Sequence, residues 1–193
     1  MNRRTVVKAA GAAALLPWLS DEGLFAFAQI QKASAAPALK TLSAGEFATL
    51  ETLAEAILPA DDRSPGAREA RVAEYVDLLL SEAEDDVRSS WRAGLAALDA
   101  LSQQRFGAGF ARLDAANAET ILGELAKNEK EPKTPLEIFF KATKNATIRG
   151  YYTSEIGIHK ELRYLGNRFT PVFIGCHTED GKDCPHCGQK AVL

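Results

Sequence analysis

Residues 43–59 read SAGEFATLETLAEAILP and carry the clearest fold signal in the chain. The stretch opens with a capping box, in which the Ser43 hydroxyl and the Glu46 carboxylate can bind the free N–H groups at a helix start. Apolar side chains then recur every three or four residues, which places them on one face of a helix. Pro59 ends the helix, because proline cannot continue the backbone hydrogen bonding. The expected buried face consists of Phe47, Leu50, Leu53, Ala54, Ile57 and Leu58.

The same spacing predicts a second helix over 68–81 and a third over about 85–104. Asp114 can cap a fourth helix, and the run Thr134-Pro135-Leu136-Glu137 starts a fifth, because it joins a capping threonine to a proline at the first helical position. No stretch alternates apolar and polar residues as a strand would. We therefore predict an all-α single domain of about five helices, with an irregular C-terminal segment from Gly150. Its inward residues should be Val72, Tyr75, Val76, Leu79, Leu80, Trp91, Leu95, Leu98, Leu101, Ile121, Leu122, Leu125, Leu136, Phe139, Phe140, Thr143 and Ile148.

The N-terminal segment is typical of a twin-arginine export signal. Arg3 and Arg4 form the arginine pair and Lys8 follows them, ahead of an apolar run over 9–19 that is too short to span a bilayer. The twin-arginine route carries cargo that is already folded, so it indicates a folded protein or complex. An ordinary secretory signal that happens to contain two arginines is the alternative.

Small residues with the spacing of signal cleavage sites occur at 26–28 and at 33–35. The mature chain is therefore expected to begin between Gln29 and Ala36. On this interpretation, residues 1–35 are the signal and cleavage region, and residues 36–193 form the helical domain with its tail. Periplasmic localisation follows from the same signal.

Composition and motifs exclude several functions. With 46% hydrophobic and 25% charged residues, the chain has ordinary globular composition, and a net charge of −3 argues against a nucleic-acid partner. The glycines at 107–112 lack the last glycine of a dinucleotide-binding loop, so no flavin or nicotinamide site is expected. Covalent haem needs a histidine directly after a Cys-x-x-Cys, whereas Gly188 follows Cys187. We expect no cofactor in this chain.

The three cysteines, Cys176, Cys184 and Cys187, all lie in the tail. An oxidising compartment would pair two of them, so we expect Cys176 to be joined to Cys184 or Cys187. The same cysteines with His177 could instead surround Zn²⁺, although adjacent Cys176 and His177 would strain one ion's geometry. The spacing of Cys184 and Cys187 also occurs in thiol–disulfide exchangers, whose active sites open a long helix after a strand.

Aromatic residues gather in the glycine-interrupted segment from Gly150 onward. Tyr151, Tyr152, Tyr164 and Phe169 lack regular helical spacing, which makes them candidates for a partner interface. Packing in the domain core is the alternative for each of them.

Several of these motifs together resemble the gluconate 2-dehydrogenase subunit 3 family. They are the twin-arginine start, Ile57-Leu58-Pro59, the turn at 64–67, the GYYTS run at 150–154 and the YLG run at 164–166. The resemblance implies the small subunit of a periplasmic, membrane-associated dehydrogenase of a sugar or sugar acid. Its implied partners are a large flavoprotein subunit that holds FAD and a multihaem cytochrome c that passes electrons to quinones.

The resemblance also implies that this chain holds no redox centre. It would help the flavoprotein subunit to fold and to pass through the twin-arginine translocase. The competing hypothesis is a small exported metal-binding or thiol-redox protein that acts through Cys176, Cys184 and Cys187.

Overall fold

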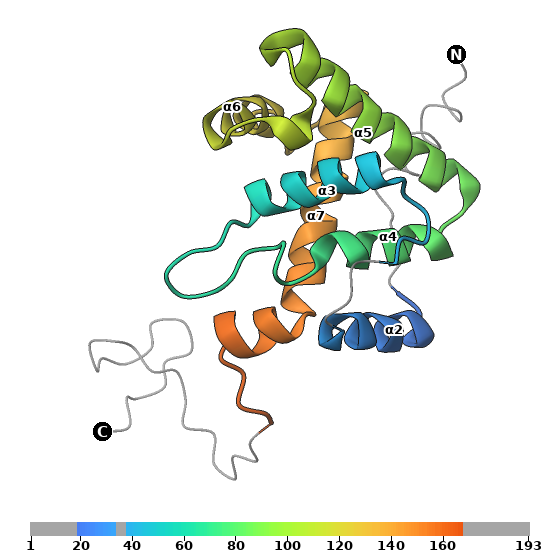
Figure 1. The fold of residues 1–193 in the computed structure, drawn as a ribbon, viewed down its shortest axis with the longest axis vertical. Helices are drawn as coiled ribbons and strands as arrows, with labels where there is room; N and C mark the ends of the chain where they lie inside the picture. Colours follow the sequence, from blue (N-terminus) through green and yellow to red (C-terminus); the bar gives the residue numbers. More distant parts are fainter. Residues whose placement is uncertain (1–18, 34–37, 168–193) are drawn as a thin grey trace, which may run out of the picture. The chain divides into compact units, whose positions relative to one another are not determined.

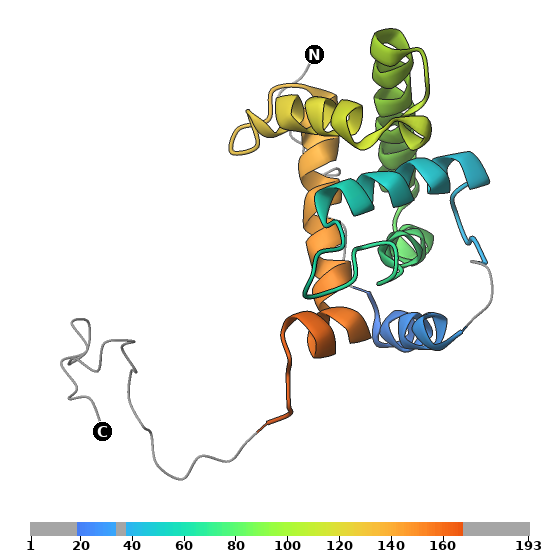
Figure 2. The same ribbon diagram turned by 60° about the vertical axis from the view of Figure 1, so that its left-hand side comes forward.

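A computed structural model describes residues 19–33 and 38–167 of the chain (Figures 1 and 2). These residues form helices and no strand, which confirms the predicted all-α class. The chain divides into two compact units, residues 1–163 and 164–193, and every described helix belongs to the first. The helices are α2 (Asp21–Lys32), α3 (Ala44–Ile57), α4 (Val72–Glu82), α5 (Asp85–Phe106), η1 (Phe110–Arg112), α6 (Ala115–Ala126), α7 (Pro135–Tyr152) and η2 (Gly157–Glu161). No helix in these described ranges is long and apolar enough to cross a membrane.

The predicted helix starts are confirmed at three caps. Ser43 and Glu46 form both bonds of the capping box, and the Ser43 N–H lies 2.8 Å from the Glu46 carboxylate. Thr134 and Glu137 form a second capping box, with the Thr134 N–H 2.9 Å from the Glu137 carboxylate. The Asp114 carboxylate accepts from the N–H of Asn117 at 2.8 Å and so caps α6. Local sequence therefore determines where α3, α6 and α7 begin.

Other boundaries differ from the prediction. Helix α4 begins at Val72 and not near residue 68, because Arg71 has a left-handed backbone with φ of 57° and interrupts the helix there. Helix α7 runs regularly to Tyr152, and the π-helical turn η2 follows in the segment predicted to be irregular. Ile148 was predicted to face inward, but its side chain is 38% exposed. Helix α2 was not predicted at all, since its sequence lies in the region assigned to the signal.

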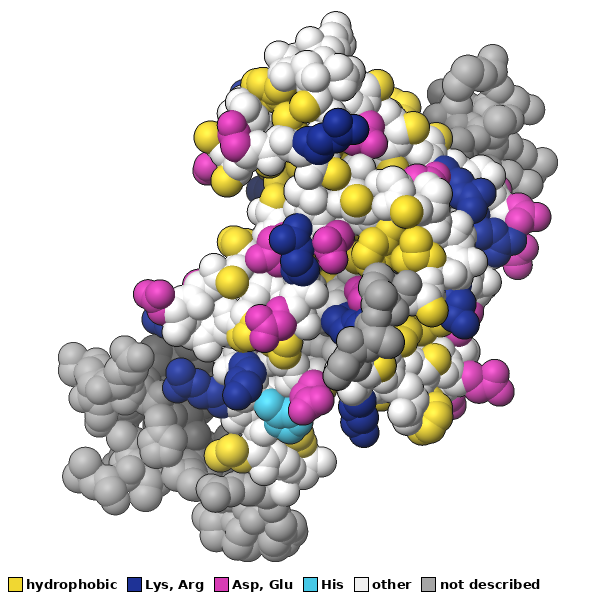
Figure 3. Space-filling model, in the orientation of Figure 1, with side chains coloured by type: hydrophobic (Ala, Val, Ile, Leu, Met, Phe, Trp, Pro, Cys, Tyr) yellow, Lys and Arg dark blue, Asp and Glu magenta, His cyan; other side chains and the backbone are white. Residues whose placement is uncertain are grey.

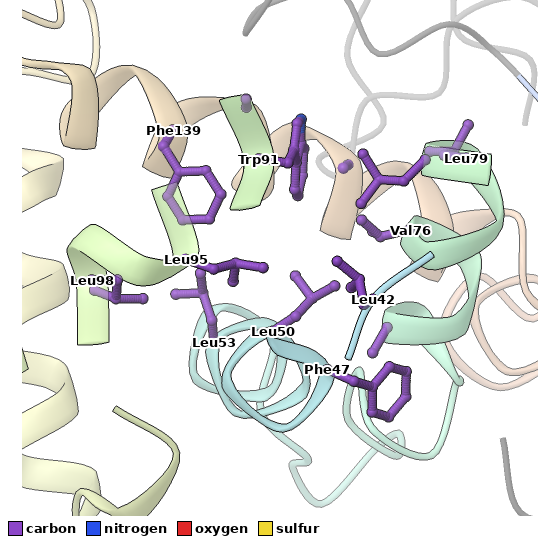
Figure 4. Packing of buried hydrophobic residues seen from close by; sticks show 14 of the residues in the cluster. Leu42, Phe47, Leu50, Leu53, Val76, Leu79, Trp91, Leu95, Leu98 and Phe139 are labelled. Carbon is purple, nitrogen blue, oxygen red and sulfur yellow. The ribbon is translucent and has the colours of Figure 1, made fainter. Parts of the chain in front are cut away.

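The main core lies between α7 and the helices that cross it, α3, α4 and α5 (Figure 1). Leu50 and Leu53 of α3 point toward Leu95 of α5 (Figure 4). Trp91 of α5 and Phe139 of α7 meet edge to face, with ring centroids 5.5 Å apart. Burial of these side chains supplies the main force that holds the helices together.

Two buried or half-buried carboxylates bind backbone N–H groups just before α3 and at the start of η1. Asp77 is only 2% exposed, and its carboxylate accepts from the backbone N–H groups of Lys40, Thr41 and Leu42 at 2.5, 3.0 and 2.7 Å. Asp99 accepts from the Phe110 N–H at 2.8 Å and so holds η1 against α5. Buried N–H groups need partners, and these side chains supply them where helices do not.

Candidate partner-binding surface

The turn between α3 and α4 meets the C-terminal end of α7 through a buried polar cluster. The hydroxyls of Ser64 and Tyr151 lie 2.8 Å apart, and the Tyr151 hydroxyl also donates to the Pro65 carbonyl at 2.8 Å. The Ser64 hydroxyl donates to the Glu161 carboxylate of η2 at 2.9 Å. We call Ser64, Tyr151 and Glu161 the turn cluster. It joins three segments that are far apart in the sequence.

The turn that carries Ser64 is shaped by its own residues. The Asp61 carboxylate accepts from the N–H groups of Arg63 and Ser64 at 2.8 and 2.9 Å. These backbone hydrogen bonds, that to Ser64 first, hold the pKa of Asp61 below its ordinary value. Gly66 lies so close to the chain that a Cβ atom there would be 2.6 Å from the Ala60 nitrogen. A residue without a side chain is therefore needed at this point.

Tyr151 belongs to the domain interior. Its side chain is 4% exposed, and burial raises its pKa, with the nearby Glu161 carboxylate adding to the rise and the Ser64 hydrogen bond opposing it. The hydroxyl is thus neutral at ordinary pH and can donate to the Pro65 carbonyl. Of the two roles that the sequence left open for Tyr151, the structure places it in the core.

The other predicted interface residues are exposed or lie outside the described residues. Tyr152 is 37% exposed, and its ring meets that of Tyr151 edge to face with the ring centroids 5.3 Å apart. Tyr164 is 47% exposed, and its hydroxyl donates to the Asn167 side chain. Phe169 lies beyond the described residues.

Sequence reasoning overlooked two leucines near these tyrosines. Leu162 is 58% exposed and Leu165 is 87% exposed, the highest value among the large apolar side chains of the described residues. We call Leu162, Tyr164 and Leu165 the C-terminal apolar segment.

Three basic side chains of the first unit lie around one depression. An open depression of about 490 Å³ is lined by Arg63, Lys160, Glu161 and Arg163. Figure 3 shows Lys and Arg side chains beside the histidine near the lower left of the face drawn there. Three of these four side chains are cationic and one is anionic, so the lining of the depression has an excess of positive charge. Such a surface attracts carboxylates of a partner.

The remaining predicted sites fall outside the described residues. They are the signal residues Arg3, Arg4 and Lys8 and the tail residues Cys176, His177, Cys184 and Cys187. The disulfide and the alternative zinc site therefore stay predictions. Within residues 19–33 and 38–167, no group of three or more His, Cys, Asp or Glu side chains is arranged to hold a metal ion.

Comparison with known proteins gave one match. A family model described as gluconate 2-dehydrogenase subunit 3 matches residues 44–171, from the first residue of α3 to beyond the C-terminal apolar segment. No curated protein and no solved structure matched the chain.

Proposed function

Since the chain belongs to the gluconate 2-dehydrogenase subunit 3 family, we propose that it is the non-catalytic small subunit of an exported, FAD-dependent dehydrogenase of gluconate or another sugar. The observation that carries this proposal is the extent of the family match. It begins at the first residue of α3 and includes every later helix among the described residues, so it covers most of the packed helical body and not a single motif.

The proposed role is assembly and not chemistry. In this proposal a large flavoprotein subunit holds FAD and oxidises the sugar, and a multihaem cytochrome c holds haem c and passes the electrons to quinones. The present chain would bind the flavoprotein subunit, support its folding and carry it through the twin-arginine translocase to the periplasm. The twin-arginine motif at Arg3 and Arg4 supports this role, because that route accepts folded complexes.

We propose that the exposed apolar side chains of Tyr152 and Leu162 in the first unit, and those of Tyr164 and Leu165 in the second, each contribute to binding the flavoprotein subunit. Tyrosine is a frequent binding hot spot, and exposed apolar side chains such as these leucines are typical of interaction surfaces. Lys160 and Arg163 adjoin the C-terminal apolar segment in the sequence and line the basic depression. A partner surface with apolar pockets and acidic residues at its edge would fit this arrangement.

Co-purification tests both the role and the surface. Wild-type chain, tagged and co-expressed with its flavoprotein and cytochrome subunits, should retain a protein with flavin absorbance and dehydrogenase activity. The double variant Leu162→Asp, Leu165→Asp should lose at least about 2 kcal/mol of binding free energy, roughly a thirtyfold loss of affinity. Phe25→Asp is a matched control, because Phe25 is also exposed, at 68%, but lies on α2.

The outcomes of this experiment separate the role from the surface. If the wild-type chain retains no flavoprotein under conditions in which dehydrogenase activity is present, the subunit role is wrong. If Phe25→Asp weakens retention and the leucine variant does not, the role stands but the binding surface lies over α2. Both variants should keep the wild-type helical signal in circular dichroism.

The export role has its own test. Lysine keeps the positive charge of arginine but loses its planar fork of donors, so specific recognition of the pair should fail in Arg3→Lys, Arg4→Lys. We expect this double variant to leave the chain in the cytoplasm, together with any flavoprotein partner that lacks its own signal. Normal periplasmic activity in the double variant would contradict the proposal.

A further inference from the structure

Helix α2 lies in the segment that the sequence assigns to signal cleavage, yet it packs as part of the domain. Phe27 is 2% exposed, and its ring meets that of Tyr75 on α4 with centroids 5.0 Å apart. Leu19, just before the helix, is 6% exposed and belongs to the same core cluster. Figure 2 shows α2 lying across from α4 at one end of the helical body. A segment that is cut away after export would not be expected to complete the core.

The start of α2 is fixed to α4 by polar contacts. The Ser20 N–H and the Ser20 hydroxyl donate to the two oxygens of the Glu82 carboxylate, at 3.0 and 2.9 Å. The same Ser20 hydroxyl accepts from the Gly23 N–H at 3.0 Å and caps the helix. One side chain thus both begins α2 and joins it to the end of α4.

The end of α2 is fixed to two further elements. Arg71, at the start of α4, donates to the carbonyls of Ile30 and Ala33 at 2.5 and 2.6 Å. The Gln31 side chain accepts from the Glu155 N–H at 3.1 Å, and Glu155 directly precedes the residues that lead into η2. The carbonyls at the C-terminal end of a helix lack the usual N–H partner one turn further along, and here Arg71 donates to two of them.

These contacts bear directly on the two predicted cleavage sites. The bond between Ala28 and Gln29 lies inside α2, next to buried Phe27, and a protease would have to draw it out of the helix. Cleavage after Ala35 would remove the whole of α2. Either cut would remove Ser20 from Glu82 and Phe27 from Tyr75, and the cut after Ala35 would also remove the Ile30 and Ala33 carbonyls to which Arg71 donates.

We infer that residues 19–33 are a permanent part of the folded domain and that neither the bond after Ala28 nor the bond after Ala35 is the processing site. The N-terminal boundary of the mature domain therefore lies at or before Leu19. This inference concerns the boundary of the domain and goes beyond the proposed subunit role. Only its processing test rests on export.

A pair of phenylalanine variants in the full chain tests the structural part without export. Phe27→Ala should lower the melting temperature by about 10 °C, because a buried aromatic is replaced by a cavity at the contact with Tyr75. Phe25→Ala should change it by no more than about 2 °C, since that side chain is 68% exposed on the same helix. The melting temperature of Phe27→Leu should lie between those of Phe25→Ala and Phe27→Ala. Phe27→Leu replaces Phe27→Ala in the comparison if Phe27→Ala does not fold. Equal melting temperatures for Phe25→Ala and Phe27→Ala would overturn the inference, whether or not the chain is exported.

N-terminal sequencing of the chain from the periplasm tests the processing part. A first residue at or before Leu19 supports the inference, and a first residue at Gln29 or Ala36 overturns it. If the chain does not reach the periplasm, the proposed export role is contradicted, and the phenylalanine pair alone decides the role of α2.

Discussion

Replacing Asp77 by alanine should cost the domain about 4 kcal/mol of unfolding free energy, because three backbone donors would lose one shared acceptor. Hydrogen bonds to a charged group are worth about 1.5–3 kcal/mol each. The Leu42 N–H is buried with Asp77 and should lose the full amount, whereas the N–H groups of Lys40 and Thr41 are partly buried and can recover some hydration. For a domain of this size, a loss of about 4 kcal/mol lowers the melting temperature by roughly 8–16 °C.

Asparagine at the same position gives a graded second variant. One carboxylate oxygen of Asp77 accepts from both Thr41 and Leu42, and the other accepts from Lys40. The amide oxygen of Asp77→Asn can keep the first two bonds, but its amino group would face the Lys40 N–H as donor to donor. The loss should therefore be about half of that in Asp77→Ala. Urea unfolding followed by circular dichroism measures both, with the exposed carboxylate variant Asp62→Ala as the control.

If Asp77→Ala lowered the unfolding free energy by less than about 1 kcal/mol, the reasoning would be refuted, because leaving buried donors unpaired should destabilise the domain by more than that. It would also be refuted if Asp77→Asn were less stable than Asp77→Ala. That order would mean that the clash of the asparagine amino group with the Lys40 N–H outweighs the two bonds that the amide oxygen keeps to Thr41 and Leu42.

Three further predictions concern packing, titration and capping. Gly150→Ala should destabilise the domain by about 1–3 kcal/mol in urea unfolding, because a Cβ atom there would lie 2.6 Å from the Tyr75 ring. Gly123 has open space around it, so the control variant Gly123→Ala should leave the stability unchanged or raise it. Burial raises the pKa values of both Tyr75 and Tyr151 in the folded protein. The stability that these two hydroxyls contribute is therefore complete below their pKa in the unfolded chain, near 10, and falls as the pH rises above that value. Urea midpoints that stay constant from pH 9 to pH 11 would contradict this. Thr134→Ala removes a helix cap and should lower the melting temperature by about 2–4 °C in a thermal scan, with no change in the overall helical signal.

The sequence was a good guide where structure is determined by neighbouring residues. The starts of α3, α6 and α7 follow from a capping side chain and a donor three residues away, and both partners are visible in the sequence. The start of α4 could not be predicted in this way. It depends on the left-handed backbone of Arg71, and arginine carries no local preference for that conformation.

The candidate surface was predictable only in part. Tyr151 and Tyr152 are adjacent tyrosines that the sequence does not distinguish. Tyr151 is buried, where its hydroxyl contacts that of Ser64, 87 residues away in the sequence, whereas Tyr152 is exposed. Helix α2 was missed for a related reason. Its small residues satisfy the pattern of a cleavage site, and only the distant contact of Phe27 with Tyr75 reveals it as part of the core.

The contact between Gln31 and Glu155 has a consequence for the time course of synthesis. These residues are 124 positions apart, and at about 5–20 residues per second a ribosome needs roughly 6–25 seconds to make the chain between them. Among the described helices, α2 is synthesised first, but its contacts can form only after α4 and then the end of α7 have been made. Residues 21–32 are therefore among the last of the described helices to reach their final position, and the docking of α2 completes the packing of these helices.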